Sequence, residues 1–114
     1  MRAITLAIIL AALAIQPVYA DPSDTAATLA VIYERAAAHG QSGAAMERLA
    51  RCESRLDPNA VGDGGHSVGL YQIHDRGLLS LFLSWGYTDR ADPWQAADFT
   101  ARALAAGLRR HWNC

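Results

Sequence analysis

One glutamate in this sequence, Glu53, occupies a position suited to acid–base chemistry. Its spacing from Met46, Leu49 and Ala50 places all four side chains on one face of a helix. That face is otherwise apolar, and a carboxylate directed toward a core is rarely found without a partner. Two interpretations are open: Glu53 pairs with an arginine or contacts water, or it lines a cleft where loss of solvation raises its pKa. In the second case the protonated side chain is a general acid.

An irregular, glycine-rich segment follows Glu53. Residues 57–59 (Asp-Pro-Asn) predict a turn, and residues 62–65 contain three glycines, which tolerate positive φ. Residues 67–73 then read as one short extended piece, half of a small hairpin. Long irregular segments in compact domains are more often functional than not. We therefore expect the end of the Glu53 helix and this hairpin to form one cleft.

Four helices on one small core are predicted to position these groups. Each has an apolar stripe at helical spacing and recognisable start or stop residues. The first begins near residues 23–25 and ends at Gly40, the second is capped by Ser42, the third runs from about Gly77 to Gly86, and the fourth has Asp92 as N-cap and Pro93 at its first position.

Residues 1–20 have the layout of a secretory signal peptide. An arginine precedes an apolar stretch over residues 3–15, and Val-Tyr-Ala at residues 18–20 forms a small-residue cleavage site. The apolar stretch is shorter than the ~20 residues that span a bilayer, so cleavage is favoured over a membrane anchor. We expect an exported, periplasmic or extracellular domain over residues 21–114, with no membrane span after cleavage.

Cysteine content and charge indicate a disulfide and argue against cofactor-dependent and nucleic-acid-binding proteins. In an exported chain the pair Cys52 and Cys114 predicts a disulfide, worth on the order of 4 kcal/mol for a loop of this length. The four histidines and the cysteines lack metal-ligand spacing, so neither a metal nor another cofactor is expected. The net charge of −1 and the absence of a basic run with interleaved aromatics argue against nucleic acid as a partner.

Three motifs in order support the second interpretation of Glu53. They are Cys52-Glu53-Ser54, Asp57-Pro58-Asn59-Ala60-Val61 and Gly69-Leu70-Tyr71-Gln72-Ile73. Together they resemble the lysozyme-like soluble lytic transglycosylases, whose pattern is E-S-x-x-x-P-x-A, a loop, then G-L-(aromatic or Met)-Q-(Ile or Val). Asp92-Pro93 and the following helix resemble that family's next segment. The resemblance covers about residues 42–106.

The resemblance implies a mainly α, lysozyme-like fold with a short hairpin at the cleft, and peptidoglycan glycan strands as substrate. Glu53 would be the catalytic acid and base at the bond between N-acetylmuramic acid and N-acetylglucosamine. Gly69, Tyr71 and Gln72 would line the sugar site, and Ser54 would support the glutamate. On a continuous strand, Gly69 leaves room for a sugar ring and Gln72 points away from Tyr71.

Alternatives remain open at this stage. A hydrolysing muramidase usually uses a second carboxylate. The candidates are Asp57, Asp63 and Asp75, each with a simpler role: Asp57 as a turn cap, Asp63 in the glycine turn and Asp75 as N-cap of the third helix. A non-catalytic glycan-binding or assembly module on the same fold is a further possibility, as is a small secreted helical interaction protein.

The C-terminal segment departs from the family pattern. Many members have a Tyr-Asn pair after the last core helix, whereas this chain ends in Trp112-Asn113-Cys114. Trp112-Asn113 could approximate that pair, with Cys114 tying the tail beside Glu53. The tryptophans could also stack on sugar rings, although Trp85 fits the apolar stripe of its helix better.

Overall fold

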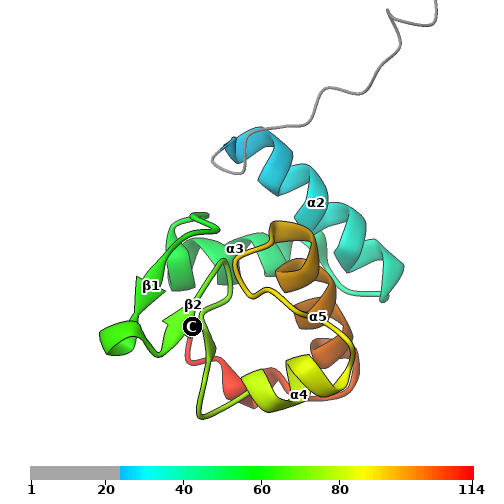
Figure 1. The fold of residues 1–114 in the computed structure, drawn as a ribbon. Helices are drawn as coiled ribbons and strands as arrows, with labels where there is room; N and C mark the ends of the chain where they lie inside the picture. The colour runs from blue at the N-terminus through cyan, green and yellow to red at the C-terminus, as the bar shows by residue number, and fades with distance from the viewer. Residues whose placement is uncertain (1–23) are drawn as a thin grey trace, which may run out of the picture.

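The computed structural model describes residues 24–114, so the predicted signal peptide lies outside the described residues. This part of the chain is mainly α-helical, as predicted. Figure 1 shows helices grouped around α5, with the small strands and the C-terminus at one side. The helices are α2 (Thr25–Ala38), α3 (Gly43–Ser54), α4 (Leu79–Ser84) and α5 (Pro93–Ala105).

The predicted helix starts are confirmed at three of the four helices. The Asp24 carboxylate accepts from the amides of residues 26 and 27, the Ser42 hydroxyl from Ala45 N, and the Asp92 carboxylate from Gln95 N. Such caps satisfy amides that have no partner within the helix. The fourth prediction, Asp75 as the cap of α4, is wrong, because α4 begins at Leu79 after a turn.

Helix α5 forms the centre of the core. Every side chain from residue 96 to residue 101 is buried, which is unusual for a helix with one solvent-facing side. α2 packs against both α5 and α3, and the aromatic ring of Phe99 meets Phe82 edge-on with centroids 5.1 Å apart. The alanines of α5 let these neighbouring helices approach it closely.

The extended piece predicted over residues 67–73 is instead two short strands and a turn. β1 (Val61–Gly62), β2 (Ser67–Val68) and β3 (Ile73–His74) form an antiparallel sheet in that order. Between β2 and β3 the chain turns at residues 69–72, where Gln72 N donates to Gly69 O at 3.1 Å. The intervening residues Leu70 and Tyr71 are both fully buried, so long-range packing overrides strand alternation here.

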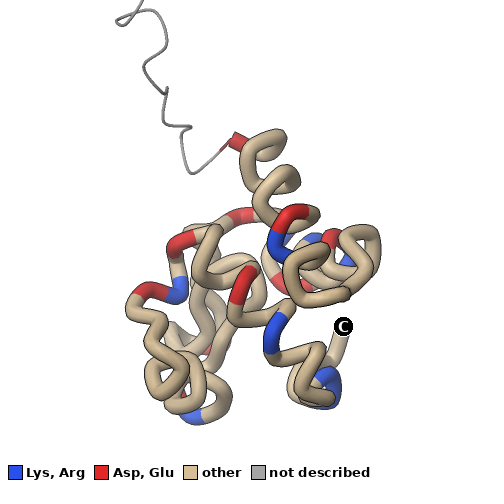
Figure 2. The backbone as a smooth tube through the Cα atoms, turned by 90° about the vertical axis from the view of Figure 1, so that its right-hand side faces the viewer, with Lys and Arg blue, Asp and Glu red and all other residues tan. Residues whose placement is uncertain are grey.

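The predicted disulfide is confirmed. It joins Cys52 in the last turn of α3 to Cys114, with Cα atoms 5.9 Å apart and a sequence separation of 62. A short 3₁₀ helix, η2 (Arg109–His111), precedes this end of the chain. Of the helices over residues 24–114, none is long and apolar enough to cross a membrane. Acidic and basic positions are interspersed along the backbone (Figure 2).

Candidate active site

Glu53 lies in the last turn of α3, where the helix stops abruptly. The two residues after the end of the helix, Arg55 and Leu56, both have left-handed backbone conformations, with φ of 55° and 62°. Residues other than glycine adopt this backbone conformation at a cost in free energy. Leu56 is buried in the core, which compensates that cost and fixes the chain reversal. The Glu53 carboxyl group is therefore held at the exit of α3, half-buried and close enough to Asp63 to sense its charge.

The surroundings of Glu53 favour its protonated form. Partial burial raises its pKa, the negative charge of Asp63 raises it further, and the guanidinium of Arg109 opposes both. Among the described residues the Glu53 carboxylate has no hydrogen-bond or ion-pair partner, so only the more distant charge of Arg109 favours its charged form. A carboxyl group of this kind is suited to donate a proton.

Asp63 is the second carboxylate of this site. It sits between β1 and β2 with φ of 51°, and its Oδ2 accepts a hydrogen bond of 2.6 Å from the Ser67 hydroxyl. The two alternatives are engaged elsewhere: Asp57 accepts from Asn59 N at 2.9 Å, and Asp75 pairs with His66 at 3.0 Å. The sequence offered Asp63 as a candidate second carboxylate with a simpler role in the glycine turn; in the structure it has the turn position, and its negative charge also raises the pKa of Glu53.

The C-terminal segment forms another side of the site. Trp112 is buried, and its indole N–H donates to Tyr71 O at 2.9 Å. Arg109 donates to Trp112 O at 2.8 Å and also to the carbonyl oxygen of Cys114. The disulfide and these contacts hold the segment, including the Arg109 charge, beside the end of α3.

Ser54 and Tyr71, both expected at the sugar site, are buried. The Tyr71 hydroxyl donates to Met46 O at 3.1 Å, and burial raises the pKa of this phenol. The Ser54 hydroxyl donates to Ala50 O at 3.0 Å, within its own helix. Tyr71 thus anchors the first turn of α3 and Ser54 its last turn, and a hydrogen bond from Ser54 to Glu53 is not among their contacts.

The geometric arguments made for Gly69 and Gln72 are wrong. Gly69 is buried with φ of 90°, and a side chain there would collide with the backbone oxygen of Arg90, so the space serves packing. Gln72 has φ of 48° and is not on a continuous strand. Its amide donates to Ala60 O at 3.1 Å and Gly69 O at 3.0 Å, tying the turn to the chain before β1.

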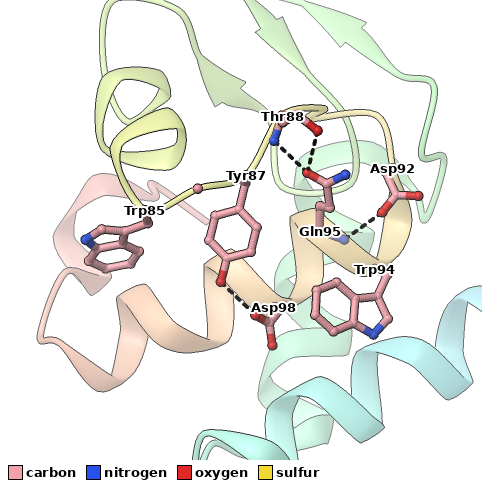
Figure 3. Close-up of a pocket in the computed structure, with 8 residues that line it drawn as sticks. Trp85, Tyr87, Thr88, Asp92, Trp94, Gln95 and Asp98 are labelled. Atoms are coloured by element: carbon pink, nitrogen blue, oxygen red, sulfur yellow. Dashed lines mark hydrogen bonds between the residues drawn. The ribbon is translucent and has the colours of Figure 1, made fainter.

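Two pockets lie on the surface of the described domain, and Glu53 lines neither of them. A groove of about 370 Å³ runs between α3 and the C-terminal segment, bounded by Leu49, Cys52 and Arg109 among others. A larger pocket of about 500 Å³ lies over α5 and the connection from α4 (Figure 3). Pocket size alone therefore does not locate the chemistry. Within residues 24–114 no group of three or more metal-ligating side chains is assembled.

Comparisons with known proteins agree with the motifs around Glu53. A family model described as the transglycosylase SLT domain matches residues 30–112, which is more than half of the chain. No curated protein and no solved structure gives a significant match.

Proposed function

Because the chain belongs to the transglycosylase SLT domain family, a lysozyme-like family that cleaves peptidoglycan, we propose that it is an exported lytic transglycosylase with Glu53 as its catalytic residue. The observation that carries the proposal is a half-buried carboxyl group with a raised pKa, without a neutralising partner, at the glutamate of the family motif. The signal-peptide pattern of residues 1–20 supports export to the compartment that holds peptidoglycan.

In the proposed reaction Glu53 acts first as acid. Its proton passes to the oxygen that links N-acetylmuramic acid to N-acetylglucosamine, and the bond from that oxygen to the muramyl C1 breaks. The electron pair of the bond remains on the departing oxygen. The carbonyl oxygen of the muramyl acetamide then stabilises the positive charge at C1, so the protein needs no second carboxylate for this step.

Glu53 acts next as base. Its carboxylate takes the proton of the muramyl 6-hydroxyl while the oxygen of that hydroxyl bonds to C1. The product carries a 1,6-anhydro ring, and Glu53 is again protonated, ready for another cycle. We propose that Ser54, Tyr71 and the Gly69–Gln72 turn shape this site indirectly, through α3 and the backbone of the turn.

A hydrolytic muramidase is the second candidate, and the position of Asp63 favours it. Ser67 orients the Asp63 carboxylate, and Asp63 contributes to the raised pKa of Glu53. As a base, Asp63 would take a proton from a water molecule that attacks C1 in place of the 6-hydroxyl. The two reactions share the first step and differ in the nucleophile.

Mass spectrometry of fragments released from purified peptidoglycan distinguishes these outcomes. We expect anhydromuramyl ends from the mature protein. Reducing ends, abolished by Asp63→Asn, would assign hydrolysis instead. Binding to peptidoglycan without release of any fragment would contradict both reactions and leave a glycan-binding or assembly module.

A further inference from the structure

The larger pocket shares no lining residue with the Glu53 site. We call it the aromatic pocket; its walls are formed by Trp85, Tyr87, Thr88, Trp94, Gln95 and Asp98 (Figure 3). Its volume of about 500 Å³ lies within the range of small-molecule sites in proteins.

A partly buried hydrogen-bond network holds one side of the aromatic pocket. The Asp98 carboxylate accepts from Tyr87 Oη at 2.6 Å and Arg35 Nη1 at 3.1 Å, and contacts His39 Nε2 at 2.8 Å. Burial alone would raise the pKa of Asp98, but these hydrogen bonds outweigh it and the pKa is lowered. The Tyr87 ring is thereby held in place without a ligand, so the pocket is pre-formed.

The rim of the pocket offers unused polar groups. Gln95 Oε1 accepts from the amides of Thr88 at 2.7 Å and Asp89 at 3.1 Å, which leaves its Nε2 without a described partner. Asp92 Oδ2 accepts from Gln95 N at 2.9 Å, and its Oδ1 has no described donor. One hydrogen-bond donor and one acceptor thus remain at the start of α5, on the same helix end as the exposed Trp94 (Figure 3).

The charges around the pocket select against an ionic ligand. The guanidinium of Arg35 lies 4.9 Å from the centre of the Trp94 ring, and that of Arg102 lies 4.2 Å from the Trp85 ring. A cation would meet these charges at the aromatic faces. An anion would meet the carboxylates of Asp92 and Asp98. What fits is a neutral ligand with an apolar face and hydrogen-bonding edges.

We propose that the aromatic pocket binds a neutral N-acetylated hexosamine unit of a glycan strand, outside the catalytic site. The Trp94 ring stacks on the C–H face of the sugar, while Gln95 Nε2 and Asp92 Oδ1 bond its acetamide or hydroxyl groups. The choice of a glycan rests on the proposed function. A second contact on the same polymer raises the local concentration of bonds available to Glu53.

The test uses the Glu53→Gln protein, so that no sugar is consumed, and tetra-N-acetylchitotetraose as the probe. The Trp94 indole N–H and the Gln95 side-chain amide are followed by NMR during the titration. We expect both signals to shift. The dissociation constant measured at the pocket should rise about tenfold in Trp94→Ala and in Gln95→Glu.

Gln95→Glu keeps the acceptor for Thr88 and Asp89 and adds a charge that the start of α5 favours, so it is expected to fold. It therefore decides the matter if Trp94→Ala does not fold. In Trp94→Ala the Gln95 amide reports binding, and in Gln95→Glu the Trp94 indole does. Tyr33→Ala is the control, because Tyr33 is a similarly exposed aromatic side chain, 45% against 43%, outside the pocket.

Shifts confined to residues around Glu53, or equal binding by all variants, would overturn the inference. So would shifts caused by a sugar-free stem peptide and not by the tetrasaccharide. Binding at the pocket by a protein that never cleaves peptidoglycan would retain the inference and contradict the proposed function. Cleavage of peptidoglycan by the parent, without any shift at Trp94 or Gln95 on addition of the tetrasaccharide, would retain the proposed function and contradict the inference.

Discussion

Glu53 and Asp98 are both carboxyl groups withdrawn from water on helices of the same core, yet their pKa values move in opposite directions. Burial raises the pKa in each case. Asp98 is the more deeply buried, but it contacts Tyr87, His39 and Arg35, and its pKa is lowered. Glu53 has no such partner and instead feels the negative charge of Asp63, and its pKa is raised.

The contrast separates a structural carboxylate from the one that we propose to be catalytic. Donors from α2 and from the connection after α4 stabilise the charge of Asp98. Because Asp98 lies on α5, these hydrogen bonds link the three segments. Glu53 has no hydrogen-bond donor among the described residues, and its pKa is raised, which favours the protonated form. Burial does not distinguish the two roles, whereas the count of donors does.

The largest effect on stability should come from the region of Glu53, whose C-terminal side is held covalently. Replacing both Cys52 and Cys114 by serine opens a loop of 62 residues and should lower the free energy of unfolding by about 4 kcal/mol. Urea denaturation of the oxidised parent and the double variant measures this difference. An unchanged midpoint would show that the C-terminal segment is held without the disulfide.

Asp98→Asn should be the next most destabilising change. It removes the charge that Arg35 pairs with in a largely buried position, and we expect a loss of about 3 kcal/mol. Glu34→Gln is the matched control, because Glu34 pairs with the same arginine at the surface and should cost less than about 1 kcal/mol. Equal losses in the two variants, measured by thermal unfolding, would contradict the structural role of Asp98.

The stability difference between the parent and Asp98→Asn should also depend on pH, with a definite sign. Since the folded-state pKa of Asp98 is lowered, its charge stabilises the fold above the unfolded pKa of about 3.9. This stabilisation is lost as pH falls through the folded-state pKa. The difference between parent and Asp98→Asn should therefore be constant near neutrality and shrink in acid. A stability difference that grows on acidification would contradict a lowered folded-state pKa for Asp98.

Smaller shifts should appear in the pH profile of the reaction. The acid form of Glu53 is lost as pH rises through its pKa, which sets the alkaline limb of the rate profile. Asp63→Asn removes a charge that raises this pKa, so the limb should move to lower pH. Arg109→Gln removes a charge that lowers it, so the limb should move to higher pH.

Asp57→Asn is the control for these two variants, because Asp57 lies in the same segment but caps its own turn. It should leave the limb in place. Shifts of Asp63→Asn and Arg109→Gln in the same direction would contradict the electrostatic picture of the site.

Local signals made the helices predictable. The caps Ser42 and Asp92 act on amides within three residues, and the apolar stripes of α2, α3 and α5 repeat at helical spacing. The disulfide could be predicted from two cysteines in a chain expected to be exported. Glu53 could be singled out because its position in the stripe and its motif agree.

The parts that depend on long-range packing were not predictable. Leu70 and Tyr71 enter the core and divide one expected strand into two. Gly69 is required by the backbone of Arg90, which is 21 residues away in sequence. The influence of Asp63 on Glu53 depends on how the glycine turn folds back, and the hydrogen bonds that hold Asp98 depend on how α2 meets α5. No periodicity in the sequence encodes these contacts.

The most direct test of the account compares Glu53→Gln with Glu47→Gln in the release of soluble fragments from peptidoglycan. Glu47 lies on the same helix and pairs with Arg51 and Tyr33, so it shares the helix but not the proposed chemistry. Glu53→Gln keeps the shape of the side chain but has no proton to give, and its rate should fall by a factor on the order of 10²–10⁴. Glu47→Gln should release fragments at close to the parent rate. Undiminished release by a folded Glu53→Gln protein would contradict the assignment of Glu53 as the catalytic acid.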